Sequence, residues 1–374
     1  MTRRLIALDV PAGPSFVDAL TRAWDDGDAV VPVDQRLPPP AKAAQLAALA
    51  VTVVRDADGT ERAHPGGRPV EDGDALVLAT SGSTGDPKGV VLTHRAVAAS
   101  AAASSARLGV TPADHWLACL PLSHVGGLAV VTRALSTGTR LTVLPRFDPD
   151  AVQSAGATLV SLVATALRRI DSARFRLVVL GGATAPDGLA DNVVTTYGMT
   201  ETGSGIVYDG VPLDGVDVGV ADDGEIHVRG PMLLRAYRSA GTDVDPRTEG
   251  WLATGDVGGW LSDGRLRVDG RRSDLIISGG ENVWPEPVER AIRRHPRVAD
   301  VVVAGTPDPE WGQVVTAYVV PAGTRAPTLD DLRLVVREEL PAHCAPRLLH
   351  IVESIPTTSL GKARRPSLRP APTS

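Results

Sequence analysis

Short apolar runs alternate with longer alanine-rich or amphipathic stretches through the first half of this chain. The apolar runs predict strands at Ala75–Ala79, Trp116–Leu120, Arg140–Leu144, Leu159–Val163 and Leu177–Leu180. The stretches between them predict helices at Arg95–Leu108 with Thr93 as a cap, at Gly127–Leu135, from Asp148 to Ala155 and at Ala164–Ile170. Strands and helices that alternate in this way predict an α/β fold with mainly parallel sheets covered by helices.

The pattern changes twice further along the chain. After about Gly205, short strands are predicted at Glu225–Arg229, Trp251–Ala253, Trp260–Leu261 and Arg265–Val268, the last two joined by the hairpin signal Asp263-Gly264. Beyond about Gly270, the expected elements are helices at Pro285–His295 and Leu329–Leu340 and strands at Val301–Ala304, Val314–Val320 and Leu349–Val352. We therefore predict a large domain over residues 1–270, with a β-rich subdomain at about 205–270, and a small α+β domain over 271–374.

Composition narrows the class of protein and of partner. Of the 374 residues, 43% are hydrophobic and 22% are charged, which is typical of a globular protein. The net charge of −6 and the 3% of aromatic residues argue against nucleic acid or an anionic membrane as the main partner. The two cysteines, Cys119 and Cys344, have no metal-binding spacing and indicate buried or incidental thiols in a reducing compartment. We expect a cytoplasmic protein, because no apolar run reaches the roughly 20 residues that span a bilayer.

The segment Thr80–Gly89, reading TSGSTGDPKG, predicts an anion-binding loop. Its glycines let the backbone approach a phosphate closely, hydroxyl and backbone N–H groups can surround the anion, and Lys88 can neutralise it. The loop is not a Walker motif, since Pro87 precedes the lysine and Gly89 follows it. The alternative, an exposed Ser/Gly linker, is disfavoured by the Pro-Lys-Gly ending between two apolar runs.

Four further motifs are each weak alone. The run Tyr197-Gly-Met-Thr-Glu201 offers an aromatic face for adenine, a hydroxyl and a carboxylate for Mg²⁺, but a turn with a surface glutamate is commoner. Asp256, behind a Thr-Gly turn, can accept hydrogen bonds from ribose hydroxyls, or can simply form the turn. His124 could contact a substrate carboxylate, or be an ordinary hydrogen-bonded loop histidine. Lys362 follows the last predicted strand, where a lone lysine is normally a solvated charge.

Taken together, the five motifs resemble, in order and spacing, the adenylate-forming superfamily of acyl-CoA synthetases, adenylation domains and luciferases. The resemblance covers about residues 74–365. It implies a two-step reaction. A carboxylate first attacks the α-phosphate of ATP to give an acyl-adenylate and diphosphate, and a thiol such as that of the co-substrate CoA then expels AMP.

The resemblance also assigns roles to residues. The β- and γ-phosphates would lie in the loop of Thr80, Ser81, Gly82, Ser83, Thr84, Gly85 and Lys88. Adenine would stack on Tyr197, beside Gly181, Gly182 and Ala183, and Asp256 with Arg271 would hold the ribose. Thr200 would contact the α-phosphate, Glu201 would bind Mg²⁺, and Lys362 would bridge the carboxylate and the α-phosphate in the adenylation transition state.

A rotation of the small domain between the two half-reactions is a further implication of the resemblance. Lys362 would leave the site, and a loop containing Gly279 and Gly280 would line the tunnel for the CoA thiol. The hinge position, usually Asp or Lys in the family, is Ser273 here, and a serine can still absorb the backbone rotation.

The run GRRSDLIISGGENVWPEPVE, residues 270–289, resembles the o-succinylbenzoate–CoA ligases of menaquinone biosynthesis. Such an aromatic acid has a succinyl carboxylate to be activated and a ring carboxylate that needs polar or cationic contacts, for which the candidates are His124, Thr165, Arg168 and Ser204. The segment before Thr80 is short for the family, so parts of its N-terminal subdomain are expected to be absent or reduced. A homodimer is compatible with the resemblance.

Three alternatives remain open from the sequence. The chain could be a ligase for another aryl or acyl acid, or a stand-alone adenylation enzyme that loads a carrier protein in trans. The third is a non-catalytic adenylate-binding protein, which loss of Lys88, Glu201 or Lys362 would have supported; all three residues are present.

Overall fold

The computed structural model describes residues 3–81, 87–182, 185–186 and 188–356. Within these ranges the chain forms four β-sheets and separates into two compact units. The first unit comprises Met1–Val218 and Val228–Leu252, and the second comprises Gly219–His227 and Ala253–Ser374. Both units combine helices with sheets, which confirms the predicted α/β class.

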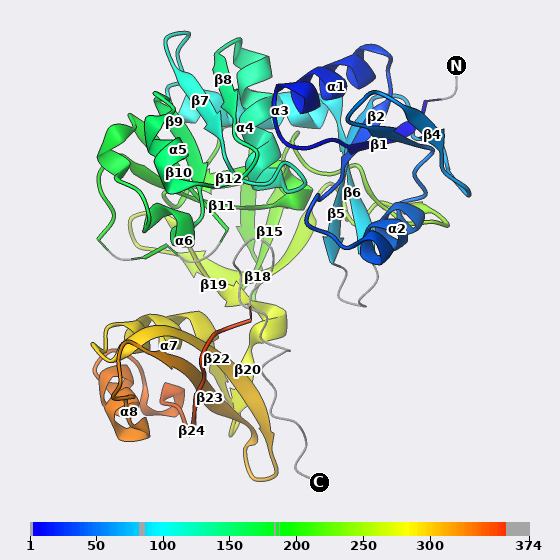
Figure 1. Ribbon diagram of the computed structural model, residues 1–374. Helices are drawn as coiled ribbons and strands as arrows, with labels where there is room; N and C mark the ends of the chain where they lie inside the picture. Colours follow the sequence, from blue (N-terminus) through cyan, green and yellow to red (C-terminus); the bar gives the residue numbers. More distant parts are fainter. Residues whose placement is uncertain (1–2, 82–86, 183–184, 187, 357–374) are drawn as a thin grey trace. The chain divides into compact units, whose positions relative to one another are not determined.

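An eight-stranded sheet forms one half of the first unit (Figure 1). In spatial order its strands are β17 (Asp243–Val244), β16 (Ala236–Arg238), β6 (Pro87–Thr93), β5 (Asp74–Ser81), β2 (Ala29–Pro32), β1 (Leu5–Asp9), β3 (Val53–Asp56) and β4 (Glu61–Ala63). Helices α1 (Pro14–Asp25) and α2 (Pro39–Ala48) connect the parallel strands β1, β2 and β3. The short segment before Thr80 thus still supplies four strands and two helices.

A seven-stranded sheet forms the other half of this unit. Its order is β13 (Val211–Pro212), β12 (Ser204–Tyr208), β11 (Val193–Met199), β10 (Leu177–Leu180), β9 (Leu159–Leu162), β7 (His115–Ala118) and β8 (Arg140–Val143). The strands from β7 to β11 are parallel, as predicted, and β12 and β13 continue the sheet in antiparallel pairs. The same region contains α5 (Pro149–Ser154), α6 (Ala164–Leu167) and the 3-10 turns η1 (Ser172–Arg174) and η2 (Thr200–Thr202). The predicted strands and helices of this region are confirmed, except that α6 ends at Leu167 rather than at Ile170.

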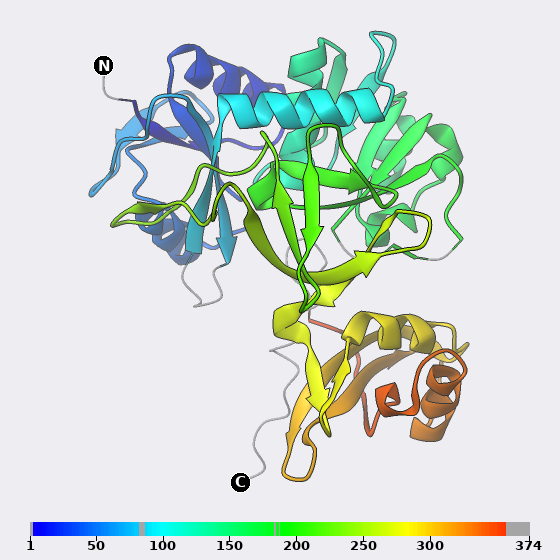
Figure 2. The ribbon, with the colours of Figure 1, turned by 180° about the vertical axis from the view of Figure 1, so that it is seen from behind.

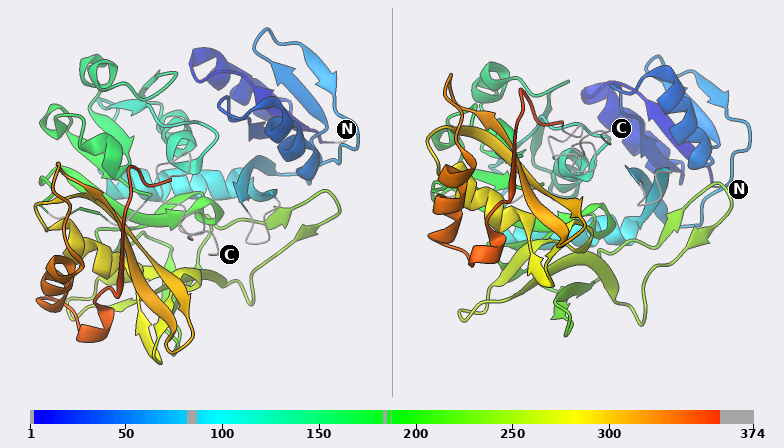
Figure 3. Two further views of the ribbon diagram at one scale, coloured as in Figure 1. Left: turned by 60° about the horizontal axis from the view of Figure 1, so that its bottom comes forward. Right: turned by 90° about the horizontal axis from the view of Figure 1, so that it is seen from below.

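Helix α3 (His94–Arg107) contacts strands of both sheets and packs against α4 (Val125–Thr137). Figure 2 shows it in cyan across the strands of the unit, and the left view of Figure 3 shows it between the two sheets. Its buried face consists of alanine and serine, so its neighbours can approach closely. The predicted cap is confirmed, because the Thr93 hydroxyl accepts a hydrogen bond of 3.1 Å from the Ala96 N–H.

A four-stranded sheet contains β14 (Asp217–Val220), β15 (Glu225–Arg229), β18 (Leu252–Trp260) and β19 (Leu266–Arg271). The predicted hairpin at Asp263-Gly264 is confirmed. The prediction of separate strands at Trp251–Ala253 and Trp260–Leu261 is wrong, since one continuous strand, β18, runs between them. The cause is a β-bulge at Gly258, where a side chain would collide with the Arg267 carbonyl oxygen, so a glycine that looks like a strand break is required inside the strand.

The last part of the chain forms a small α+β fold. Its sheet consists of β21 (Glu281–Val283), β20 (Ile276–Ser278), β23 (Gly312–Pro321), β22 (Val298–Asp308) and β24 (Leu348–Ile351), which pairs with β23. Helices α7 (Pro285–Arg293) and α8 (Leu329–Arg337) close a shared apolar core, with the turns η3 (Arg272–Asp274) and η4 (Ala342–Cys344) nearby in the sequence. The strands and helices predicted here are present, with shifted ends.

Both cysteines are buried and unpaired, as predicted, and burial raises the pKa of Cys119 to about 12. Such a thiol is unreactive at neutral pH. Among the helices that the structure describes, none combines the length and hydropathy needed to cross a lipid bilayer.

Candidate active site

The predicted anion-binding loop connects the two strands of an antiparallel hairpin. Strands β5 and β6 pair on either side of it with Thr80 opposite Lys88, and the Thr80 hydroxyl donates a 3.4 Å hydrogen bond to the Lys88 carbonyl oxygen. Lys88 therefore lies on a paired strand and not at a helix N-terminus, which separates this loop from a Walker motif. Ser81 pairs with Pro87 through the backbone; Gly82, Ser83, Thr84 and Gly85 lie outside the described residues.

Lys88 and Glu201, 113 residues apart in the numbering, contact the same tyrosine. The Lys88 ammonium lies 3.4 Å from the ring centroid of Tyr237, and the Tyr237 hydroxyl donates a 2.8 Å hydrogen bond to Glu201 Oε1. All three side chains are half-buried. The structure thus brings the predicted phosphate-binding lysine and the predicted Mg²⁺ ligand to one place.

The turn η2 presents Thr200 and Glu201 directly after strand β11. The Thr202 hydroxyl closes the turn, accepting a 3.0 Å hydrogen bond from the Met199 N–H and donating one of 2.6 Å to the Ser204 carbonyl oxygen. Gly203 follows with a φ of 67°, in the left-handed region that favours glycine. The Glu201 carbonyl oxygen also accepts a 2.7 Å bond from a backbone N–H of the segment before β16. Backbone contacts on both sides therefore fix the place of the Glu201 carboxylate.

Tyr197 and the two glycines predicted beside adenine occupy one edge of the seven-stranded sheet. Tyr197 lies near the end of β11, and Gly181 and Gly182 follow the parallel neighbour β10. Ligands of such sheets bind at the carboxyl ends of the strands. A Cβ atom at Gly181 would lie 2.9 Å from the Thr196 hydroxyl oxygen, so this position has no room for a side chain. Ala183 lies outside the described residues.

His124 precedes helix α4 and contacts an arginine that follows the first sheet's strand β2. Arg36 Nη2 lies 3.2 Å from His124 Nε2, and Arg36 is itself held by Asp34 through hydrogen bonds of 2.8 and 2.6 Å. Burial, and then the Arg36 charge, lower the pKa of His124. Since an arginine can only donate, Nε2 accepts and the ring proton is on Nδ1. The contact with Arg36 therefore leaves Nδ1–H as the donor of the His124 ring.

Ser204 contacts a buried arginine on α4. Arg133 is 2% exposed; its Nη2 donates hydrogen bonds of 2.5 Å to the Ser204 hydroxyl and 3.1 Å to the Tyr208 hydroxyl, and its Nε donates one of 2.8 Å to Ser104. The guanidinium also lies 5.6 Å from the ring centroid of Trp116. Within the described part of the chain, Arg133 forms no ion pair with a carboxylate. A buried cation with only neutral partners is unusual, since buried charges are normally paired.

The remaining candidates for the acid, Thr165 and Arg168, lie on and just after α6. Both are exposed, and neither side chain forms a hydrogen bond or ion pair with another described residue. Among the described residues, His124 and Ser204 each contact an arginine, whereas the side chains of Thr165 and Arg168 form no hydrogen bond or ion pair.

In the second unit, the predicted ribose pair lies side by side on β18 and β19. Asp256 pairs with Arg271 across the hairpin, and Arg271 Nε is 3.1 Å from Asp256 Oδ1. Asp256 is 6% exposed, and its N–H donates a 3.1 Å hydrogen bond to the Thr254 hydroxyl. The carboxylate is thus held in a fixed orientation. Ser273 follows in η3 and is exposed.

The predicted CoA loop lies between β20 and β21, where Gly279 and Gly280 have φ values of 61° and 85°. The Gly279 N–H donates a 2.9 Å hydrogen bond to the Trp311 carbonyl oxygen, and a Cβ atom at Gly279 would lie 2.6 Å from the Trp311 ring. The Arg347 guanidinium covers this ring at 3.6 Å from its centroid. Lys362 lies outside the described residues.

Sequence reasoning missed three residues of this site, namely Tyr237, Arg133 and Arg36. Tyr237 and Arg36 give no local signal, because their contacts join segments that are far apart in the chain. Arg133 did give one, since it is a charged residue within the apolar helix run Leu128–Leu135. A charge on the apolar face of a helix indicates a buried polar contact.

Comparisons with known proteins agree with this geometry. The profile of the AMP-binding enzyme family matches residues 54–238, and that of the AMP-binding enzyme C-terminal domain matches residues 287–362. A probable 2-succinylbenzoate–CoA ligase of Mycobacterium tuberculosis (strain CDC 1551 / Oshkosh) is 41% identical over 330 residues, covering 81% of this chain and 85% of the relative. A 2-succinylbenzoate–CoA ligase of Bacillus cytotoxicus is 36% identical over 334 residues, covering 78% of this chain and 69% of the relative.

Solved structures give the same picture. The o-succinylbenzoate CoA synthetase of Bacillus subtilis, in complex with its acyl-adenylate intermediate, superimposes with a TM-score of 0.86 at 28% identity, covering 99% of this chain and 89% of that one. The amide bond synthetase of Marinactinospora thermotolerans gives a TM-score of 0.85 at 28% identity, covering 99% and 90%. The chain therefore belongs to the AMP-binding enzyme family, together with the 2-succinylbenzoate–CoA ligases that it resembles in sequence.

Proposed function

We propose that this protein converts o-succinylbenzoate, ATP and CoA into o-succinylbenzoyl-CoA, AMP and diphosphate, a reaction of menaquinone biosynthesis. The names of the relatives support this substrate, and a Bacillus subtilis structure at 28% identity contains the acyl-adenylate OSB-AMP. In the first step, a succinyl carboxylate oxygen attacks the α-phosphorus of ATP, and diphosphate leaves. In the second step, the CoA thiolate attacks the acyl carbonyl carbon, and AMP leaves.

The observation that carries the choice of acid is the buried arginine behind Ser204. Arg133 donates to the Ser204 hydroxyl oxygen at 2.5 Å, so the hydroxyl proton of Ser204 can point toward a substrate. An uncompensated buried cation costs several kcal/mol, about what a countercharge from a ligand can offset. We infer that Arg133 and Ser204 together meet the ring carboxylate, which a simple benzoate or fatty acid bound through its reacting group lacks. His124, Thr165 and Arg168 remain further proposed contacts to the acid.

The roles proposed for nucleotide binding follow the family resemblance residue by residue. The hairpin loop with Thr80, Ser81 and Lys88 would hold the β- and γ-phosphates, and Thr200 the α-phosphate. Adenine would stack on Tyr197 beside Gly181, Gly182 and Ala183. The fixed carboxylate of Asp256, paired with Arg271 at 3.1 Å, is suited to accept hydrogen bonds from ribose hydroxyls. Lys362 would place a positive charge at the α-phosphate as negative charge develops there.

Glu201 fits the role of a Mg²⁺ ligand. Among the described residues, no group of three or more His, Cys, Asp or Glu side chains could hold a metal ion by itself. Mg²⁺ in nucleotide sites is instead held by one or two carboxylates together with the substrate phosphates, so a single glutamate is sufficient. When bound, the ion neutralises charge on the phosphates. A Bacillus subtilis relative of known structure contains ATP and magnesium.

The second step would use the loop of Gly279 and Gly280 as part of the thiol tunnel. This role requires the part of the chain after the hinge at Ser273 to rotate, so we retain residues 1–270 and 271–374 as the proposed fixed and mobile domains. A homodimer and a cytoplasmic location also remain predictions.

The proposed function is tested by measuring acid-dependent diphosphate release with ATP and Mg²⁺, with and without CoA. The acids are o-succinylbenzoate, β-benzoylpropionate, benzoate, 4-chlorobenzoate and octanoate. Preference for o-succinylbenzoate with formation of its CoA ester is the expected result. Preference for another acid would reject the substrate and keep the reaction, and inactivity with all acids would reject both.

We expect Asp256→Asn to raise the KM for ATP about tenfold, because it replaces a charged hydrogen-bond acceptor with a neutral one. The variant should also discriminate less between ATP and its 3′-deoxy analogue than the parent does. The matched control is Asp269→Asn, which alters the ion pair between Asp269 and Arg267, both on strand β19. An unchanged KM and unchanged discrimination would remove Asp256 from the ribose site.

We expect Gly279→Ala to slow CoA-ester formation about tenfold while diphosphate release changes little. The added methyl group would lie 2.6 Å from the Trp311 ring, which must then move. Gly280→Ala is the matched control, since its φ is also positive but nothing lies within 4 Å of its Cβ position. Equal effects of both substitutions would assign the loss to backbone strain and not to the Trp311 contact.

A further inference from the structure

Tyr237 contacts both Lys88 and Glu201 through its side chain. Its ring lies under the Lys88 ammonium at 3.4 Å, and its hydroxyl donates to Glu201 Oε1 at 2.8 Å. The three residues come from β6, η2 and β16, and Tyr237 is opposite Val90 in the pairing of β16 with β6. One side chain therefore connects the proposed phosphate-binding residue, Lys88, with the proposed Mg²⁺ ligand, Glu201.

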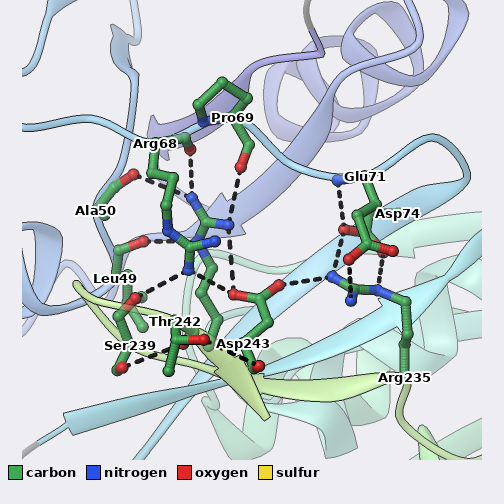
Figure 4. A network of polar contacts seen from close by, with 11 residues as sticks. Leu49, Ala50, Arg68, Pro69, Glu71, Asp74, Arg235, Ser239, Thr242 and Asp243 are labelled. Carbon is green, nitrogen blue, oxygen red and sulfur yellow. Dashed lines mark hydrogen bonds and ion pairs between the residues drawn. The ribbon is translucent and has the colours of Figure 1, made fainter. Parts of the chain in front are cut away.

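The strand that carries Tyr237 is held rigidly by its neighbour Arg238. The Arg238 side chain is fully buried and donates to the carbonyl oxygens of Leu49, Ala50, Arg68 and Pro69, four residues that Figure 4 labels. Burial lowers its pKa to about 10, still well above neutrality, so the guanidinium stays charged. Four carbonyl acceptors fix both the position and the direction of this side chain.

A second arginine fixes β16 from the other side of Tyr237. Arg235 forms ion pairs of 2.8 Å with Asp74, 2.7 Å with Glu71 and 2.7 Å with Asp243 (Figure 4). The Asp74 side chain is fully buried, so its pair with Arg235 is not an exposed surface pair of the kind that contributes little. Tyr237 thus lies between two anchored residues, and its ring has a defined position.

The two contacts of Tyr237 have different chemistry. A cation–π contact is weak enough to orient an ammonium group and still release it to a phosphate. A phenol that donates to one carboxylate oxygen leaves the other oxygen for a cation. The first contact prepares Lys88 for the nucleotide, and the second prepares Glu201 for the metal.

We propose that Tyr237 is a positioning residue that sets both the phosphate-binding lysine and the Mg²⁺-binding carboxylate through separable contacts. This inference rests on the proposed function, which supplies the roles of Lys88 and Glu201. The ring acts on nucleotide binding, and the hydroxyl acts on metal binding.

Two substitutions separate these contacts. Tyr237→Phe keeps the ring and removes the hydroxyl, whereas Tyr237→Leu removes both. Tyr318→Phe, which removes the hydroxyl of a buried tyrosine in the second unit, is the control. The measurements are the Kd of a non-hydrolysable ATP analogue without metal, the Kd of Mn²⁺ in the analogue complex by electron paramagnetic resonance, and the Tm.

For Tyr237→Phe we expect Mn²⁺ to bind about tenfold more weakly, with metal-free binding of the analogue unchanged. Tyr237→Leu should weaken both, and Tyr318→Phe neither. The proposal is overturned if Tyr237→Phe leaves Mn²⁺ binding unchanged, or if both variants weaken both ligands equally while the Tm falls. These binding measurements stand apart from catalysis, so an inactive parent protein would reject the proposed function without deciding the role of Tyr237.

Discussion

Replacing Glu201 by Gln is expected to lower kcat/KM for acid-dependent diphosphate release about 100-fold, because a bound metal contributes several kcal/mol of charge stabilisation. The glutamine has nearly the same shape, and its amide oxygen can still accept the hydrogen bond that Tyr237 donates to Glu201 Oε1. What is lost is the negative charge. Raising the Mg²⁺ concentration should recover part of the activity, which a titration of the rate against Mg²⁺ would measure.

The control for this prediction is Glu338→Gln, which removes an exposed carboxylate just after α8. It should leave both the rate and the Mg²⁺ dependence unchanged. If Glu201→Gln has the same Mg²⁺ dependence as the parent protein, Glu201 is not a metal ligand, even if the rate falls.

Replacing Arg133 by Met is expected to lower kcat/KM for o-succinylbenzoate by about 30- to 150-fold, the equivalent of one hydrogen bond to a charged group of about 2–3 kcal/mol. With β-benzoylpropionate, which has the same succinyl arm and no ring carboxylate, the rate should hardly change. The fold should be retained or even stabilised, because methionine removes a buried charge that has only neutral partners in the described structure. Kinetics with the two acids and a thermal melt measure both effects.

Arg107→Met is the matched control for Arg133→Met. Arg107 is an exposed arginine at the end of α3 that donates a 3.3 Å hydrogen bond to the Tyr208 carbonyl oxygen, near but outside the Arg133 contacts. The Arg107→Met variant should have the same effect on kcat/KM with both acids. Equal losses with both acids in Arg133→Met would mean that Arg133 supports the fold of the site and does not recognise the ring carboxylate.

Much of the fold could be predicted because its signals are local. The parallel strands β9 and β10 lie within short, mainly apolar runs, and the Thr93 and Asp148 caps lie directly before α3 and α5. The error at β18 arose because the signal there is not local. Glycine is normally depleted in strands, but Gly258 is required by the close approach of the Arg267 carbonyl oxygen, which the sequence does not reveal.

The same contrast between local and long-range signals applies to the residues of the candidate site. Glu201, Asp256 and Lys88 could be proposed from the sequence because each belongs to a short motif in a recognisable order. Arg271 lies opposite Asp256, since the hairpin turn fixes which residues face each other. Tyr237 could not be found, because its role depends on the pairing of β16 with β6, two strands that are separated by more than half of the first unit's chain.

The hydrogen bonds of Arg238 and the ion pairs of Arg235, on and beside β16, affect how the chain folds. Arg238 binds carbonyl oxygens at Leu49 and Pro69, and Arg235 binds Asp74, so each contact closes a loop of more than 150 residues. Contacts with such high sequence separation form slowly, because the entropy of loop closure is lost before the contact compensates for it. On a ribosome, β5 and β6 would be synthesised well before the strand that completes their sheet edge. We therefore expect the hairpin of the phosphate site to acquire its final geometry late in folding, only after the segment around Tyr237 has been synthesised and docked.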